Sequence, residues 1–158
     1  MTQPEPPAGG ESHLTFRRIL VAYDGSPHAK RALDAAASLA GIANSRLTVL
    51  TVVPEVSAWM LSGAMGAPID IPELQDDAKR AATKELDEAV GSLRGDLEVE
   101  KIVEVGRPGP DIVQRATSGE NDLVVVGSRG RGEAAALFLG SVSQHVSHGS
   151  SIPVLIVR

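Results

Sequence analysis

The sequence predicts an α/β fold in which a single five-stranded parallel sheet is flanked by helices. Five short apolar runs alternate along the chain with stretches whose apolar residues recur at helical spacing, a pattern typical of strand–helix–strand units. One of these runs, at residues 122–127, is almost wholly apolar, as expected for a strand inside a parallel sheet. A chain of 158 residues has the size of one ordinary domain, and we find no internal repeat that would divide it.

A strand and a helix open the predicted domain. Residues 16–23 (FRRILVAY) end in a compact apolar run that is typical of a strand. Ser26 can cap the helix that follows, and Pro27 suits its first turn. Residues 27–41 have six apolar residues at helical spacing on one face: Ala29, Ala32, Leu33, Ala36, Leu39 and Ala40. We expect Gly41 to close this helix.

A second strand is predicted over residues 46–53, and Pro54 ends it. Residues 54–71 form a long loop that contains several large apolar side chains. Loops of this length usually form a lid or a binding loop, or are disordered. Covering a ligand or a partner and packing onto the domain's own surface explain the apolar residues equally well. A helix is then predicted from Pro72 to about Arg94, because its apolar residues lie near the helical period.

The remaining elements complete the alternation. Residues 97–105 largely alternate between apolar and polar side chains, which indicates a strand near an edge of the sheet. The chain then continues with a short helix from Pro110 to Thr117, the apolar strand at 122–127, a helix at 141–149 and a last strand from Pro153 to Val157. In parallel sheets of this kind ligands bind at the carboxyl ends of the strands, where the strand order reverses.

Composition excludes several classes of function. The net charge is -5, and we find neither a basic stripe nor the aromatic side chains on which single-stranded nucleic acid stacks, so no nucleic-acid partner is expected. The absence of cysteine excludes disulfides, thiolate nucleophiles and cysteine-based metal sites. No stretch approaches the roughly 20 apolar residues that a membrane helix needs, so no membrane partner is expected either.

The first fifteen residues differ from the rest. Residues 1–15 offer few side chains for burial, and we expect a disordered tail there, with the folded domain at 16–158. Nothing in this tail resembles a secretory signal, so a cytoplasmic location is the default expectation.

A glycine-rich loop carries the clearest functional signal. It begins at Gly127, at the end of the most apolar strand, and reaches the start of a helix at Gly140 and Ser141. A helix start presents backbone N–H groups without partners and a partial positive charge, so anions bind there. Gly130 and Gly140 would let a phosphate approach the backbone, and the hydroxyls of Ser141 and Ser143 are further donors. The alternatives are that the glycines only form turns and that Ser141 only caps its helix.

Two better-known phosphate motifs are not matched. Gly127 and Gly132 have the spacing of a P-loop, but Glu133 follows where that motif needs lysine. The loop reads Gly-x-x-Gly-x-Gly and lies after the fourth strand, whereas the dinucleotide pattern is Gly-x-Gly-x-x-Gly early in the fold.

The glycine pattern instead resembles that of the universal stress proteins. Gly127-x2-Gly130-x9-Gly140-Ser141 agrees with that family's ATP-binding pattern at every position, and the stretch ILVAYDGS at residues 19–26 looks like the family's first strand and acidic turn. The resemblance extends over residues 16–158. It implies a Rossmann-like sheet of strand order 3-2-1-4-5, with ATP as the ligand, Mg²⁺ beside its phosphates, and a homodimer formed through the last strand, Pro153 to Val157.

The resemblance also implies a role for each residue of an ATP site. Asp24 would lie near the ribose or a phosphate-bound Mg²⁺, and Val52 would offer backbone hydrogen bonds to the adenine edge. The full set implied to contact the nucleotide is Ala22, Tyr23, Asp24, Val52, Val126, Gly127, Arg129, Gly130, Gly140, Ser141, Val142 and Ser143.

Asp24 has support of its own, because a carboxylate at the end of a buried strand is well placed to coordinate Mg²⁺ or a ribose hydroxyl. An Asx-type turn before Gly25 is its alternative role. No convincing catalytic set is found, so the expected function is a nucleotide-responsive stress or signalling module with at most weak ATP hydrolysis. The alternatives are a nucleotide-dependent enzyme, such as a slow ATPase or an adenylyl or phosphoryl transferase, and a nucleotide-free dimeric stress protein.

Overall fold

The computed structural model of the protein describes residues 16–56, 70–132 and 139–158. The predicted α/β fold is confirmed. The strands are β1 (Arg18–Ala22), β2 (Arg46–Pro54), β3 (Val99–Gly106), β4 (Leu123–Gly127) and β5 (Val154–Val157). The helices are α1 (Pro27–Ala43), α2 (Ile71–Gly91), α3 (Pro108–Thr117) and α4 (Ser141–Gly149).

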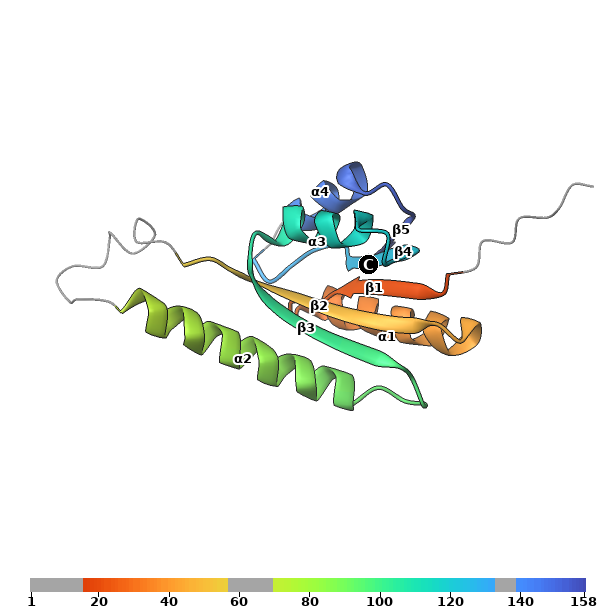
Figure 1. The fold of residues 1–158 in the computed structure, drawn as a ribbon, viewed down its shortest axis with the longest axis horizontal. Helices are drawn as coiled ribbons and strands as arrows, with labels where there is room; N and C mark the ends of the chain where they lie inside the picture. Colours follow the sequence, from red (N-terminus) through yellow and green to blue (C-terminus); the bar gives the residue numbers. More distant parts are fainter. Residues whose placement is uncertain (1–15, 57–69, 133–138) are drawn as a thin grey trace, which may run out of the picture.

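All five strands lie parallel in one sheet, in the order β3-β2-β1-β4-β5 (Figure 1). This is the expected order, with β3 and β5 at the two edges. β1 pairs with β2 on one side and with β4 on the other, so the order reverses between β1 and β4. Connections from β1 and from β4 leave in opposite directions at this point, which opens a crevice at the carboxyl ends of the strands.

Helices cover both faces of the sheet, α1 and α2 on one and α3 and α4 on the other (Figure 1). Each strand of a parallel sheet therefore buries side chains on both sides. Ile19, Val21 and Val125 pack against α1 on the first face, while Leu20 and Val124 lie in the core under α3 and α4 on the second. These two apolar cores fix the position of the strand ends at which a site would form.

The ends of α1 illustrate one confirmed prediction and one correction. Ser26 caps the helix, since its Oγ accepts a hydrogen bond of 3.1 Å from the Ala29 N–H. Gly41, however, does not close the helix, which continues to Ala43 and ends at Asn44. Asn44 adopts the left-handed conformation (φ 52°), which asparagine tolerates, and its N–H bonds the Ala40 carbonyl, so a glycine was not needed there.

Other boundaries shift by a few residues. α2 was expected to begin at Pro72 but begins at Ile71, with the side chain of Asp70 as its cap. α3 was expected to begin at Pro110 but begins at Pro108. The proposed tail at 1–15 and most of the long apolar loop, residues 57–69, lie outside the described residues. In the described part of the chain no helix is long and apolar enough to cross a membrane.

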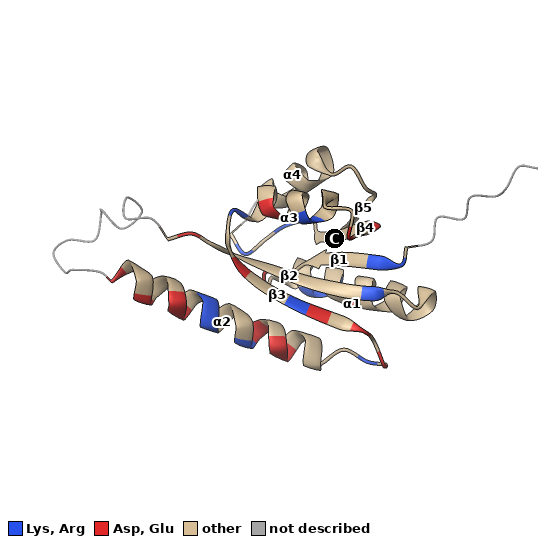
Figure 2. Cartoon of the chain, viewed as in Figure 1, with Lys and Arg blue, Asp and Glu red and all other residues tan. Residues whose placement is uncertain are grey.

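Acidic side chains lie toward both ends of α2, with basic side chains between them (Figure 2). Arg80 pairs with Asp77 and Lys84 with Glu88 on the exposed side of this helix. Such exposed pairs contribute little to stability.

Candidate functional site

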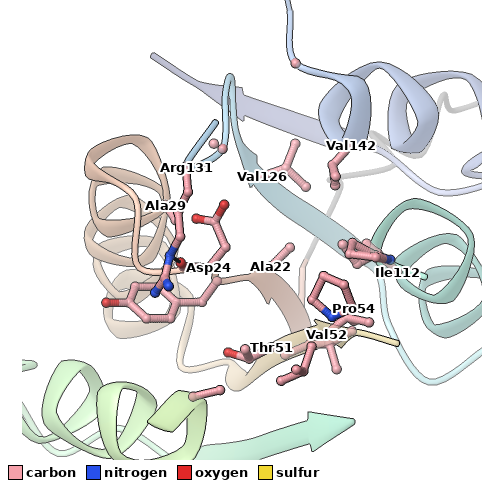
Figure 3. Close-up of a pocket in the computed structure, with 18 of the residues that line it drawn as sticks. Ala22, Asp24, Ala29, Thr51, Val52, Pro54, Ile112, Val126, Arg131 and Val142 are labelled. Atoms are coloured by element: carbon pink, nitrogen blue, oxygen red, sulfur yellow. Dashed lines mark hydrogen bonds between the residues drawn. The ribbon is translucent and has the colours of Figure 1, made fainter. Parts of the chain in front are cut away.

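A cavity of about 670 Å³ lies at the carboxyl ends of β1, β2 and β4 (Figure 3). Its position is the one that the strand order predicts. The structure brings all twelve residues of the expected ATP site to this one cavity: Ala22, Tyr23, Asp24, Val52, Val126, Gly127, Arg129, Gly130, Gly140, Ser141, Val142 and Ser143 all line it.

The end of β1 shapes the floor of the cavity. The last hydrogen bond that joins this chain segment to β2 runs from the Tyr23 N–H to the Leu50 carbonyl, at 2.8 Å. Backbone groups of alternate residues point to the same side of a strand, so those of Val52 point into the space that β1 has left. A ligand placed there can therefore extend the sheet's hydrogen bonding at Val52.

Asp24 lies at the centre of the cavity wall (Figure 3). Its Oδ1 accepts a hydrogen bond of 3.0 Å from the Ser26 N–H, so the Asx-type turn considered for this residue is present. Its Oδ2 approaches Gly130 so closely that a Cβ on that glycine would lie 2.8 Å from the oxygen. The turn uses one carboxylate oxygen, and the glycine leaves the other room on the side of the loop.

Close packing against α1 explains the glycine at position 127. A Cβ on Gly127 would lie 2.7 Å from the backbone carbon of His28 and 2.9 Å from the nitrogen of Ala29. Glycine is therefore needed because the start of α1 packs against the end of β4. Closeness to a phosphate is not required to explain this residue.

The start of α4 lies at the cavity. Gly140 is its N-cap, and none of the described side chains caps the helix. The Gly140 N–H donates to the Ser128 carbonyl at 2.8 Å, which fixes the helix start against the end of β4. The backbone N–H groups of the first helical turn belong to Ser141, Val142 and Ser143, and all three residues line the cavity. This is the arrangement that binds anions at helix N-termini.

Ser143 is used differently from the prediction that its hydroxyl is a donor for phosphate. This buried hydroxyl donates to the carbonyls of Ser128 and Gly140, at 3.0 and 2.9 Å. Its single proton is thus committed in this conformation, and the side chain holds the loop against the helix start.

Arg131 links three segments around the cavity and was not among the twelve residues expected to contact the nucleotide. Its guanidinium donates to the backbone carbonyl of Asp24 and to the carboxylate of Glu85 on α2. Burial raises the pKa of the nearby Tyr23 phenol above its ordinary value, and the Glu85 carboxylate raises it further. Tyr23 is therefore a neutral hydrogen-bonding group at physiological pH.

His28 lies behind the loop, at the start of α1. Its Nδ1 is 2.9 Å from the hydroxyl of Ser128 and 3.0 Å from the Arg31 guanidinium. Arginine can only donate, so Nδ1 is the acceptor in that contact. Burial lowers the pKa of His28, and the positive charges of Arg31 and Arg129 lower it further.

Several lining residues could not be found from sequence. They come from α2, from the beginning of α3 and from the middle of β2, and include Thr51, Ala78, Ala81, Ala82, Glu85, Pro108 and Ile112. Periodicity places the alanines on the sheet-facing side of a helix, but nothing in it signals that a cavity lies beneath them. Among the described residues, no group of three or more His, Asp or Glu side chains is arranged to hold a metal ion.

The fold and the cavity define the class: a Rossmann-like α/β protein with a ligand cavity at the switch point of an open parallel sheet. The model of the universal stress protein family matches residues 15–158, and the chain belongs to this family.

Known relatives agree with this assignment. A universal stress protein of Thermus aquaticus is 38% identical over 143 residues, covering 90% of this chain and 99% of its own. The universal stress protein YxiE of Bacillus subtilis is 37% identical over 147 residues, with 90% and 99% coverage. Among solved structures, MJ0577 of Methanocaldococcus jannaschii superposes with a TM-score of 0.76 at 25% identity, covering 90% of this chain and 96% of that one. A universal stress protein in complex with cAMP superposes with a TM-score of 0.60 at 27% identity, covering 91% and 98%.

Proposed function

We propose that this universal stress protein binds an adenine nucleotide, with ATP as the preferred ligand, and acts as a nucleotide-responsive stress or signalling module. The observation that carries the proposal is the start of α4, which lines the same cavity as Asp24 and the described part of the glycine loop. A relative of this fold has been solved with cAMP, which supports an adenine nucleotide as the class of ligand.

Different residues contact each part of the nucleotide. The phosphates are held by the backbone N–H groups of Val142 and Ser143 together with Gly130, Gly140, Ser141 and Arg129. Ala22, Tyr23, Val126 and Gly127 lie beside the adenosine, and the backbone of Val52 meets the adenine edge. A triphosphate is favoured over a monophosphate because two separate anion-binding segments, the loop and the helix start, line one cavity.

Mg²⁺ fits this site through the nucleotide. Magnesium usually keeps several waters and is bound by one or two carboxylates together with substrate phosphates. Asp24 supplies one carboxylate, and Gly130 leaves space beside its Oδ2. The ion would supply positive charge between Asp24 and the phosphates, which would otherwise repel each other.

The module acts as a homodimer in the cytoplasm. β5 is an edge strand, and the N–H groups of Val124 and Ser128 bond the carbonyls of Pro153 and Val157 on its inner side. The backbone groups of Val154 and Ile156 therefore point outward and can pair with a second copy of the same strand.

Replacing Gly140 with Val tests the site. The φ of -66° at Gly140 suits valine, so the helix start should survive, while the added side chain would occupy the approach of the phosphate. Calorimetry should show ATP binding to the wild type and a loss of at least a hundredfold in the variant. Gly91→Val is the matched control, because a Cβ there meets no atom within 4 Å and lies far from the cavity. ATP affinity in the Gly140 variant equal to that of the control would refute the site.

A further inference from the structure

The cavity extends to both faces of the sheet. On one side it is bounded by Val52, Val126 and Ile112, under α3 and α4. On the other side it continues beneath the middle of α2. We call this second part the α2 compartment, and its walls are Tyr23, Thr51, Val53, Ala78, Ala81, Ala82 and Glu85.

Small side chains on α2 create this compartment. Toward its end α2 packs closely on the sheet, with Leu86 buried and Ala89 and Val90 against the same core. In its middle the residues that line the cavity are three alanines and Glu85, and Leu86 is the only residue of the helix that is buried. The middle of the helix thus stands over the strand ends without filling the space beneath it.

Thr51 gives an independent indication that this space receives a ligand. Its side chain is 8% exposed, and its Oγ1 has no hydrogen-bond partner among the described residues. Figure 3 shows the residue at the cavity floor, with its oxygen on the side of α2. Buried hydroxyls in native proteins nearly always have a partner, so an unpaired one at a cavity wall points to a group that binds there.

The sheet determines the orientation of that group. The backbone of Val52 points into the gap beyond the end of β1, so a flat ring that bonds this backbone lies near the plane of the sheet. One face of the ring then meets the side chains under α3, and the other meets the α2 compartment. The compartment walls suit an uncharged ring, since they are mainly methyl groups and the ring of Tyr23, and the carboxylate of Glu85 is already paired with Arg131.

We propose that the α2 compartment covers one face of the nucleotide's base and that the hydroxyl of Thr51 hydrogen-bonds the polar edge of that base. The proposal rests on the proposed function, and it makes Thr51 and the α2 alanines determinants of base recognition. In the free protein the Oγ1 atom is covered. Rotation about the Cα–Cβ bond to another staggered rotamer turns the hydroxyl toward the base when the ligand enters.

Two substitutions test the compartment. Thr51→Val has nearly the same shape without the hydroxyl, and it should weaken ATP binding about three- to tenfold, the usual net value of one hydrogen bond. It should also raise the melting temperature of the free protein, because an unpaired buried hydroxyl is removed. Ala82→Leu fills the compartment and should weaken ATP binding at least tenfold. Thr83→Leu is the matched control, since Thr83 is exposed and does not line the cavity.

Calorimetry with ATP and thermal unfolding of the free proteins decide the outcome. If both variants bind ATP as tightly as the wild type and the control, the α2 compartment does not take the base, while the nucleotide site itself stands. If the wild type does not bind ATP, the proposed function fails and this inference fails with it. A clear drop in the melting temperature of free Thr51→Val would show that the hydroxyl has a partner without ligand, which also overturns the inference.

Discussion

At the scale of single residues, Asp24 combines a structural and a proposed ligand-binding role. Its Oδ1 accepts the Ser26 N–H at 3.0 Å, and its Oδ2 faces Gly130. An alanine at position 24 would remove both the hydrogen bond of the turn and the negative charge. A change in ATP affinity could then not be assigned to one of these two losses. Asparagine keeps an oxygen for the turn and removes only the charge.

We therefore expect Asp24→Asn to fold normally and to lose most of the effect of Mg²⁺ on ATP affinity. In the wild type the Asp24 carboxylate also repels the phosphates. Without magnesium, the variant should therefore bind ATP at least as tightly as the wild type. Titrations in the presence of Mg²⁺ and in EDTA measure the two cases. An equal loss of affinity under both conditions would remove the metal role from Asp24.

His28 makes the stability of the folded protein depend on pH. Its pKa is lowered in the folded chain, first by burial and then by Arg31 and Arg129, whereas Asp24 acts in the opposite direction. The unfolded chain therefore takes up a proton at a higher pH than the folded chain. The contribution of His28 to the free energy of unfolding is fully present above the pKa of the unfolded chain, near 6.5. It is lost as the pH falls through that pKa toward the lower pKa of the folded chain.

His28→Gln should remove this contribution. Between about pH 7.5 and pH 5.5, a range that brackets histidine titration, the melting temperature of the wild type should fall more than that of the variant. Comparing the two proteins cancels the carboxylates and the other histidines, which titrate in both. Parallel curves would show that His28 binds its proton equally in the folded and unfolded states.

At the scale of elements, the edge strand β5 carries the proposed dimer. Leu155 projects from this strand and is 36% exposed. Leu155→Lys would place like charges across a self-pairing edge, and we expect the protein to become a monomer in sedimentation experiments. Ile42, which is 86% exposed at the end of α1, offers a matched control as Ile42→Lys. If the wild type is a monomer, or if Leu155→Lys sediments as a dimer, β5 is not the interface.

Elements with strong local signals were predictable from the sequence. The apolar run before Gly127 and the Ser26–Pro27 helix start depend on interactions between near neighbours, which periodicity and capping rules describe. The predicted end of α1 at Gly41 was wrong because glycine is common after helices but is also tolerated inside them. Asn44 provided the left-handed residue instead. The middle of α2 was placed correctly, yet its distance from the sheet depends on side chains that meet only in the folded molecule.

At the scale of the whole molecule, the glycine pattern predicted which loop and which helix start meet at the cavity. The pattern could not show which residues from other elements complete the walls. Arg131 contacts Glu85, which is 46 positions away along the chain, and Thr51 lines one cavity with the α2 alanines only in the folded molecule. Nor could spacing reveal that Gly127 packs closely against the backbone at the start of α1. Long-range packing of this kind leaves no mark on local sequence.

A crystal structure of the protein with saturating ATP and Mg²⁺ would show directly whether the start of α4 holds the phosphates. We expect phosphate oxygens to lie within hydrogen-bond distance of the backbone nitrogens of Val142 and Ser143, at the start of α4. A start of α4 that stays empty at saturating nucleotide, or a nucleotide bound elsewhere, would contradict this expectation.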